Sequence, residues 1–267
     1  ACGCQLVTNV KLIANNGKTL MSDQTEPTQT TKTETQKINA TKTVRLWDFP
    51  VRLFHWSLVI AIVTSWWTNQ ELMIDIHALA GYCVLALVLF RIAWGFVGSS
   101  NARFSNFLTG PRKVFGYLMK LPTGGVTELT YPGHNPAGGW MVAVLIVLVA
   151  VQAISGLFAS EDTFLFFDGP LVAYASSDIA RTMNFIHHTN INLIYIAVGL
   201  HVFAALFYLV VKRENLIRAM VTGMHHVPES IAAGFMQIRF ASPVLGIAIL
   251  VVCGLAVWAL VAVARGG

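Results

Sequence analysis

Residues 186–211 read IHHTNINLIYIAVGLHVFAALFYLVV, a stretch without any Asp, Glu, Lys or Arg. A helix needs about 20 predominantly apolar residues to cross the hydrocarbon core of a bilayer, and this stretch is long enough. His187 and His201 are 14 residues apart. This is close to four turns of an α-helix, so both side chains lie on one face, about 21 Å apart along the axis. His188 points away from that face and is the weaker candidate. Because ionisable side chains are costly within a bilayer, the stretch predicts a transmembrane helix with two functional histidines.

The composition of the whole chain indicates a membrane protein. Of its 267 residues, 55% are hydrophobic and only 12% are charged, with a mean hydropathy of +0.62. A soluble domain normally has about a quarter charged residues. Four further apolar runs approach the length of a membrane span, and they cover residues 53–68 (extended by an interfacial stretch from Trp47), 77–97, 140–159 and 244–263. We therefore expect an all-α membrane protein with a four-helix transmembrane bundle and a fifth, C-terminal transmembrane helix.

The N-terminal region, residues 1–43, is polar. We expect it to be a disordered tail, because the residues that follow Met21 have almost no apolar content. Met21 precedes an ordinary polar segment and is the expected start of the native protein, with residues 1–20 upstream of it. Processing as a lipoprotein at Cys2 or Cys4 is the alternative.

The rest of the chain divides into three regions. Residues 44–218 form the expected four-helix domain, residues 219–240 a cytoplasmic linker, and residues 241–267 the fifth transmembrane helix. Within the linker, residues 230–240 form either a short amphipathic helix on the membrane surface or a plain connection.

The charged residues of the loops predict the orientation of the chain. Lys and Arg are concentrated before the first apolar run, between the second and the third, and after the fourth, whereas the opposite loops are mainly acidic. Because basic loops stay in the cytoplasm, we expect the N-terminus inside and the end of the fifth helix outside. The net charge of +5 does not indicate a nucleic-acid partner, since no Lys/Arg block contains interleaved aromatic residues.

Two further histidines match the depths of the first two. His77 begins the second apolar run on the outer side, at the depth of His187, and His55 begins the first run on the inner side, at the depth of His201. A single histidine in a membrane helix is equally compatible with a hydrogen bond to a neighbouring helix, but four at two matched depths favour cofactor binding. Two imidazoles suit the two axial positions of a haem iron, whereas zinc needs three or four converging ligands. We therefore predict an outer and an inner haem b.

Three arginines are candidate partners of the haem propionates. Arg91, 14 residues after His77, lies at the depth of the inner haem, where a buried cation needs a counter-charge. Arg52, one turn before His55, either reaches the same propionates or snorkels to the membrane surface. Arg181 is the basic residue of an otherwise acidic outer loop and is the candidate for the outer haem. Room for the porphyrins is expected beside three glycines of these helices, Gly81, Gly156 and Gly199.

Several motifs resemble those of the bacterial cytochrome b561 and Ni,Fe-hydrogenase cytochrome b family. They are VRLWD (44–48), FHW (54–56), HALAGY (77–82), FRIAWGFVG (90–98), ARF (102–104), GHNPAGGW (133–140), HH (187–188) and KRENL (212–216). The resemblance implies a four-helix core in the bacterial inner membrane that binds two haems b, with ligands at His55, His77, His187 and His201. It does not account for the fifth helix. His134, in the GHNP turn, is expected to order the loop or to form an interface.

The resemblance also implies electron transfer. The leading hypothesis is a conduit that carries electrons across the cytoplasmic membrane between the quinone pool and a partner redox protein, with quinone near the inner haem beside Arg52 and Arg91. The expected partner is a periplasmic or membrane protein, either a c-type cytochrome or a hydrogenase-like subunit. The alternatives are a membrane anchor and electron-transfer subunit of a hydrogenase-like complex, and a stand-alone oxidoreductase acting between quinol and oxygen or superoxide. Whether the chain is itself an enzyme stays open.

Overall fold

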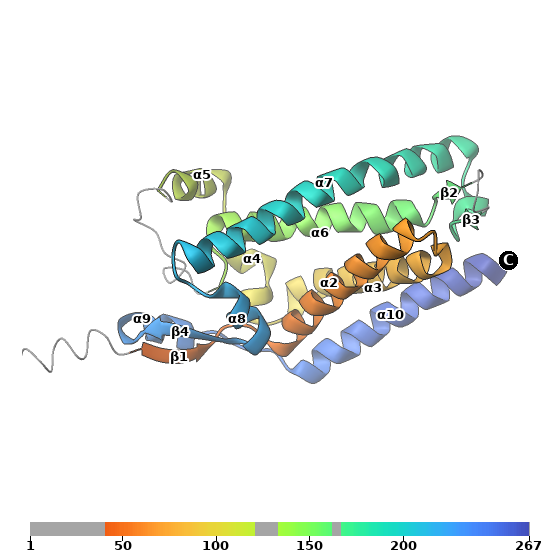
Figure 1. Cartoon of the computed structure of the whole chain (residues 1–267). Helices are drawn as coiled ribbons and strands as arrows, with labels where there is room; N and C mark the ends of the chain where they lie inside the picture. Colours follow the sequence, from red (N-terminus) through yellow and green to blue (C-terminus); the bar gives the residue numbers. More distant parts are fainter. Residues whose placement is uncertain (1–40, 121–132, 162–166, 267) are drawn as a thin grey trace, which may run out of the picture.

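The structure, a computed structural model, describes residues 41–120, 133–161 and 167–266 (Figure 1). The predictions for residues 1–40, including the start at Met21, lie outside these residues. Among the described residues, five helices are long and apolar enough to cross a membrane: α2 (Phe49–Gln70), α3 (Ile74–Val97), α6 (Pro136–Gly156), α7 (Ser177–Val210) and α10 (Pro243–Gly266). The predicted all-α fold with a fifth, C-terminal spanning helix is confirmed.

Three of these helices, α2, α6 and α7, begin at a polar cap that precedes the predicted apolar run. The Asp48 carboxylate accepts a hydrogen bond from the Val51 backbone N–H at 2.8 Å, and Asn135 accepts one from the Gly138 N–H at 2.7 Å. Ser176 caps α7 in the same way. Such caps satisfy backbone N–H groups that have no partner within the helix. These helices therefore extend beyond their apolar runs at the N-terminal end.

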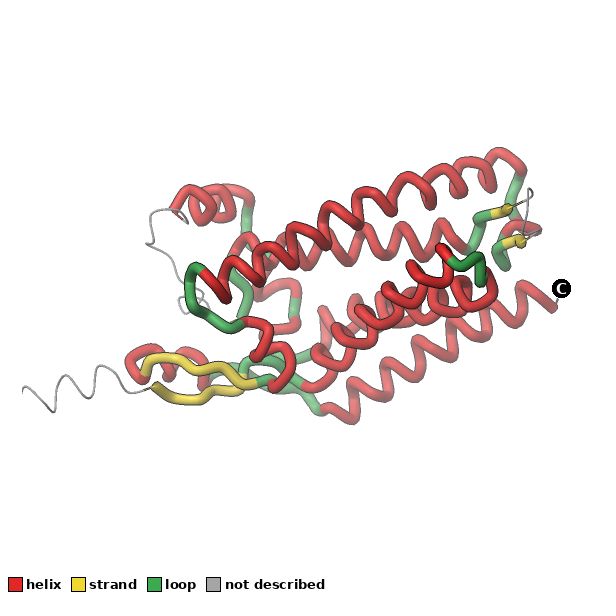
Figure 2. The backbone as a smooth tube through the Cα atoms, in the orientation of Figure 1, coloured by secondary structure: helices red, strands yellow, loops and turns green. Residues whose placement is uncertain are grey.

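The helices are arranged as two antiparallel pairs with one addition (Figure 1, Figure 2). Helices α2 and α3 form one pair and α6 and α7 the other, while α10 lies along α3 on the side away from α6 and α7. Val84 and Val88 of α3 pack against Val149 of α6 and Ile194 of α7 in a buried cluster between the pairs. We call the end where α2 begins and α7 ends the inner end, and the opposite end the outer end.

A small structural unit caps the inner end. Strand β1 (Thr41–Arg45) pairs antiparallel with β4 (Met224–Pro228), and helices α8 (Leu216–Thr222) and α9 (Glu229–Met236) flank them (Figure 2). The side chains of Val44, Trp47, Trp94, Val227 and Phe235 belong to one buried cluster that joins this cap to α2 and α3.

The cap corrects two of the predicted boundaries. The disordered tail was expected to extend through residue 43, but residues 41–43 belong to β1, and residues 219–240 are a folded part of the cap rather than a linker. Of the two alternatives for residues 230–240, a helix is present as α9, and its buried residues Ala232 and Phe235 pack against the cap. The pairing of β1 with β4 joins segments that are far apart in the sequence, so no local pattern indicates it.

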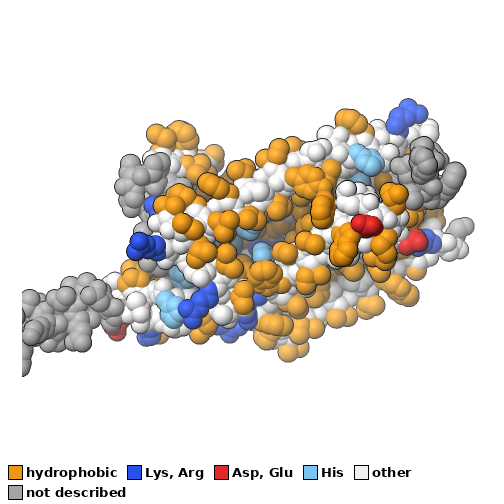
Figure 3. All heavy atoms as spheres, viewed as in Figure 1, with side chains coloured by type: hydrophobic (Ala, Val, Ile, Leu, Met, Phe, Trp, Pro, Cys, Tyr) orange, Lys and Arg blue, Asp and Glu red, His pale blue; other side chains and the backbone are white. Residues whose placement is uncertain are grey.

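Short elements connect the spanning helices. After α3 come η1 (Ser100–Ala102), α4 (Phe104–Phe107) and α5 (Pro111–Lys120) at the inner end. At the outer end, β2 (Ser160–Glu161), β3 (Phe167–Asp168) and η3 (Val172–Tyr174) lie between α6 and α7. Large apolar side chains are exposed along the spanning helices, for example Val147, Phe203 and Val252, and they dominate the face seen in Figure 3. Lipid is the solvent that such a surface requires.

Candidate functional site

Four histidine side chains from α2, α3 and α7 meet in two pairs. The ring centroids of His77 and His187 are 6.2 Å apart at the outer end, and those of His55 and His201 are 6.3 Å apart at the inner end. Each pair joins two different helices, and α7 contributes one ring to both. These are the two pairs that the helical spacing predicts.

The spacing within each pair is suited to one metal ion between two imidazoles. A metal–imidazole nitrogen bond is about 2.0–2.1 Å long and the ring centre lies about 1.1 Å beyond the nitrogen, so two rings on opposite sides of a metal have centres about 6.3 Å apart. Both observed separations match this value. Among the described residues, no three His, Cys, Asp or Glu side chains converge. Each depth thus offers two imidazoles, the number that completes a porphyrin-bound iron.

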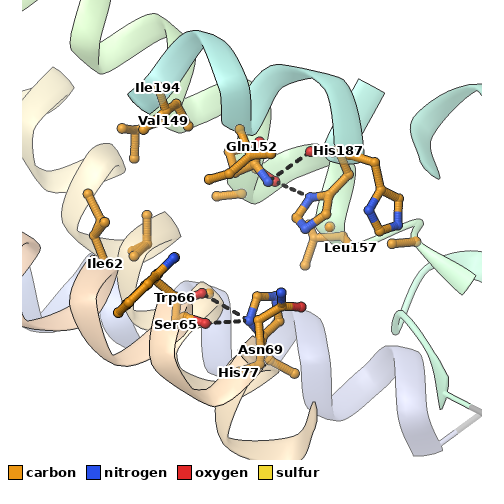
Figure 4. Close-up of a pocket in the computed structure, with 18 of the residues that line it drawn as sticks. Ile62, Ser65, Trp66, Asn69, His77, Val149, Gln152, Leu157, His187 and Ile194 are labelled. Carbon is orange, nitrogen blue, oxygen red and sulfur yellow. Dashed lines mark hydrogen bonds between the residues drawn. The ribbon is translucent and has the colours of Figure 1, made fainter. Parts of the chain in front are cut away.

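Backbone carbonyls hold the two rings of the outer pair (Figure 4). The Nδ1 atom of His77 lies 2.8 Å from the Ser65 carbonyl oxygen, and that of His187 lies 3.0 Å from the Gln152 carbonyl oxygen. A carbonyl can only accept, so each Nδ1 carries the proton and donates. The Nε2 atom of each neutral ring therefore keeps its lone pair, which is the state that binds a metal.

The outer pair faces a cavity of about 570 Å³ between α2, α3, α6 and α7 (Figure 4). This volume falls within the range of about 300–1,000 Å³ that is usual for cofactor sites. The lining is mainly apolar, and none of the described residues that form it is Lys, Arg, Asp or Glu. Figure 3 shows the hollow between the helices, with histidine side chains inside it.

The three glycines singled out from the sequence all line this cavity. A Cβ atom on Gly156 would lie 3.0 Å from Cε1 of His187, tighter than ordinary contact, whereas a Cβ on Gly81 or Gly199 would meet no atom within 4 Å. Gly156 thus allows α6 to approach the His187 ring. The other two leave open space beside the histidines, as a flat macrocycle requires.

Neutral polar side chains, and not Arg181, line the outer end of the cavity. Asn69, Asn184 and His188 are part of the lining, and the Oδ1 atom of Asn184 is buried without a hydrogen bond to any described residue. Arg181 lies outside the lining and pairs with Asp178 at 3.4 Å, with side chains that are 79% and 87% exposed. The Arg181 side chain extends to the surface, and its contact with an outer haem stays a prediction.

Arg91 is buried near the inner pair. Its side chain is 3% exposed, and Nη1 donates to the Ala102 carbonyl at 3.1 Å while the guanidinium lies over the Phe104 and Phe107 rings. Within the described residues it forms no ion pair. The buried Asp48 carboxylate already accepts from the Trp94 indole N–H at 3.1 Å. The charge of Arg91 is thus available to an anionic group at this end.

Arg52 reaches the cap instead of the membrane surface. Its Nη1 atom donates to the Val221 carbonyl at 2.6 Å, and its Nε atom is buried without a partner among the described residues. Gly223 packs against this side chain in a left-handed conformation with φ +80°, where a Cβ would lie 3.1 Å from Nε. The cap therefore fixes Arg52 close to the start of α2, one turn from His55.

His134 packs beside the inner site. Its ring lies between those of Trp47 and Phe107, with centroid separations of 4.8 and 4.5 Å. Burial, together with the charges of Arg91 and His201, lowers the pKa of His134 to about 3. The imidazole is thus neutral near pH 7, and its position agrees with the predicted role in ordering the loop before α6.

The comparisons with known proteins decide the family. The family model described as prokaryotic cytochrome b561 matches residues 46–223. This chain belongs to the prokaryotic cytochrome b561 family. Membership implies a b-type haem and a multi-pass membrane protein that transfers electrons. The matched region contains all four paired histidines and ends before α10.

Several curated relatives are similar to this b561-family chain over most of its length. A probable Ni/Fe-hydrogenase B-type cytochrome subunit from Azotobacter vinelandii is 26% identical over 226 residues, which are 70% of this chain and 90% of the relative. A protein of the same description from Bradyrhizobium diazoefficiens is 23% identical, covering 68% and 85%. The probable superoxide oxidase CybB from Yersinia pestis is 23% identical, covering 62% and 90%. No solved structure matches the chain.

Sequence reasoning missed the neutral polar residues of the cavity. Asn184 lies three residues before His187, so the two share a face of α7, and this spacing was a usable signal. Asn69 lies at the end of α2, beside His77 (Figure 4). Its place at the cavity depends on the turn between α2 and α3, and the sequence contains no signal for that.

Proposed function

We propose that this chain is a two-haem cytochrome b that carries electrons across the cytoplasmic membrane between the quinone pool and a partner redox protein. The observation that carries the proposal is the two histidine pairs, at 6.2 and 6.3 Å centroid separation, which lie at two depths along α7. Their histidines are about 21 Å apart along that helix, so the edges of two porphyrins would lie much closer together. Closed axial positions favour electron transfer over oxygen binding.

At the outer site, His77 and His187 would hold the haem through Nε2. The Ser65 and Gln152 carbonyls fix both rings and raise the basicity of the ligating nitrogens. Asn69, Asn184 and His188 would bind the carboxylates of the haem. Since the amide of Asn184 can rotate to exchange its nitrogen and oxygen, it can present a donor there. When bound, the haems supply the iron that accepts and passes on single electrons.

At the inner site, His55 and His201 would be the ligands, and Arg52 and Arg91 the cations that face the carboxylates. Both guanidinium groups are held in place, by Val221 and Ala102 respectively. A fixed cation beside a haem stabilises its reduced form, because reduction lowers the positive charge of the site. We place the quinone at this end, where the same cations stabilise a reduced, anionic oxygen.

The partner follows from the charge of the loops and from the relatives. Basic residues at the inner end orient the N-terminus toward the cytoplasm and the outer haem toward the periplasm, which fits the inner membrane of a bacterium. The relatives described as Ni/Fe-hydrogenase B-type cytochrome subunits support a hydrogenase-like partner at the outer end. A c-type cytochrome is the other class of partner that would exchange electrons with the outer haem.

Electron transfer through reconstituted protein tests the proposal. Wild type in liposomes, with cytochrome c sealed inside and dithionite outside, should reduce the sealed cytochrome c much faster than protein-free liposomes. His55→Ala and His77→Ala should each abolish the gain, since both haems are needed in series. His226→Ala, on the cap, is the matched control and should conduct like wild type. Equal rates for wild type and both ligand variants would refute the conduit.

A second function has its own support. The Yersinia pestis relative is described as a probable superoxide oxidase, and the alignment covers 90% of it. For this chain that activity would pass electrons from superoxide to quinone without a protein partner. Superoxide consumption by the purified protein with added quinone distinguishes this function from the conduit, which needs a partner protein.

A further inference from the structure

Helix α5 (Pro111–Lys120) lies at the inner end, outside the bundle (Figure 1). One side is attached to the protein. Tyr117 is 4% exposed and its hydroxyl hydrogen-bonds to the hydroxyl of Tyr208 on α7. Just before α5, the Thr109 carbonyl accepts from the indole N–H of Trp140 on α6 at 2.8 Å. The helix is therefore fixed to α6 and α7 and does not move freely.

A second side of α5 is apolar and uncovered by the described residues. The exposed fractions of Phe115, Leu118 and Met119 are 66%, 47% and 64%. With about 100° per residue, these three side chains and Val114 fall on one continuous arc that begins next to the buried Tyr117. Exposing such an apolar arc to water is energetically unfavourable.

The third side of α5 is basic. Arg112, Lys113 and Lys120 are exposed, and the helix contains no acidic residue. Lys113 and Lys120 lie opposite the apolar arc, and Arg112 lies at its edge beside Met119. Apolar and cationic arcs on one short helix are the pattern of a helix that lies in the membrane–water interface. The cationic arc is complementary to negatively charged lipid headgroups.

We propose that α5 is an in-plane membrane helix that inserts its apolar arc among acyl chains and binds anionic phospholipid headgroups through its basic arc. The surface around it supports a lipid over a protein partner. α5 is attached to spanning helices whose nearby residues, Trp140 on α6 and Val210 on α7, are themselves 43% and 71% exposed. The apolar arc thus continues the lipid-facing surface. This inference rests on membrane embedding and does not depend on the haems.

Depth measurements on the full chain in nanodiscs test the proposal. In a background without the four native cysteines, a fluorophore is attached at Phe115→Cys on the apolar arc or at Lys113→Cys on the basic arc. Brominated lipids mixed with phosphatidylglycerol should quench the label at position 115 strongly and the matched label at position 113 weakly. Met119→Cys provides a second apolar position, in case the change at Phe115 disturbs the helix.

The role of charge is tested separately. Arg112→Glu, Lys113→Glu and Lys120→Glu together leave the apolar arc intact and should reduce quenching at position 115. Replacing phosphatidylglycerol with phosphatidylcholine should have the same effect on the unaltered helix. Equal quenching on both arcs overturns the insertion, and quenching that ignores both changes overturns anionic recognition. A label at position 115 that is shielded from water but not quenched by lipid would indicate a protein contact and also overturn the proposal.

Discussion

At the scale of single residues, the outer site is built by small and fixed neighbours. His187 is held through Nδ1 by the Gln152 carbonyl, and the missing side chain of Gly156 lets the ring sit close to α6. The pairing of the four histidine rings could be predicted, because 14 residues on one helix place His187 and His201 on a common face, and the other two histidines lie at matching depths. The carbonyl partners could not, since they depend on how α6 packs against α7.

Gly156→Leu should remove the outer haem. The new side chain begins 3.0 Å from the His187 ring and extends into the cavity, so haem content is expected to fall from about two to about one per chain. Gly254→Leu, also in a spanning helix but with open space around its Cβ, is the control and should keep both haems. The pyridine haemochrome spectrum measures the content. Full occupancy in Gly156→Leu would show that the cavity is not the haem site.

His134 should make the protein sensitive to acid. Its folded pKa of about 3 lies below the unfolded value of about 6.5, so between these values the unfolded chain binds more protons and stability falls as the pH falls. From pH 7.5 to pH 5 this group alone should cost about 2 kcal/mol. In His134→Phe the drop in thermal midpoint over this range, measured in detergent, should be smaller. An identical drop in both proteins would contradict the buried neutral state.

At the scale of elements, α10 packs against the cytochrome bundle but lies outside the family match, which ends at residue 223. Gly246 lies against Pro50 of α2 and Trp94 of α3, and a Cβ there would come within 2.5 Å of the Pro50 ring. Gly246→Leu should push α10 away from the bundle and destabilise the protein by about 1–3 kcal/mol, while the haem spectrum stays unchanged. Thermal unfolding in detergent measures this, with Gly254→Leu again as the control. Loss of haem in Gly246→Leu would mean that α10 supports the sites directly.

The elements also show where sequence reasoning stops. All five spanning helices were predictable, because apolar runs near the length of a bilayer core have few alternatives. The cap was not predictable, because β1 and β4 pair through backbone hydrogen bonds. Strands this short show no recognisable alternation of apolar and polar residues in the sequence. His225 illustrates this: its position opposite Val44 in the strand pair leaves it 8% exposed, and burial lowers its pKa.

At the scale of the whole molecule, the two sites differ in charge. The outer cavity has a lining without charged side chains, whereas Arg91 and Arg52 are fixed near the inner pair. The inner haem should therefore have the higher midpoint potential. Arg91→Gln should lower the potential of one haem by about 60 mV or more, equivalent to about 1.4 kcal/mol for one electron. Arg112→Gln, exposed on α5 at the same end of the molecule, is the matched control. A potentiometric titration in which both variants behave alike would contradict the asymmetry.

The central claim, two haems held by four named histidines, has one direct measurement. Haem b per chain is determined from reduced-minus-oxidised and pyridine haemochrome spectra of wild type, His55→Ala and His77→Ala, with His226→Ala on the cap as the control. We predict about two haems in wild type and in the control, and about one in each ligand variant, with the inner haem lost in the first and the outer haem in the second. Unchanged haem content in both ligand variants would contradict the assignment.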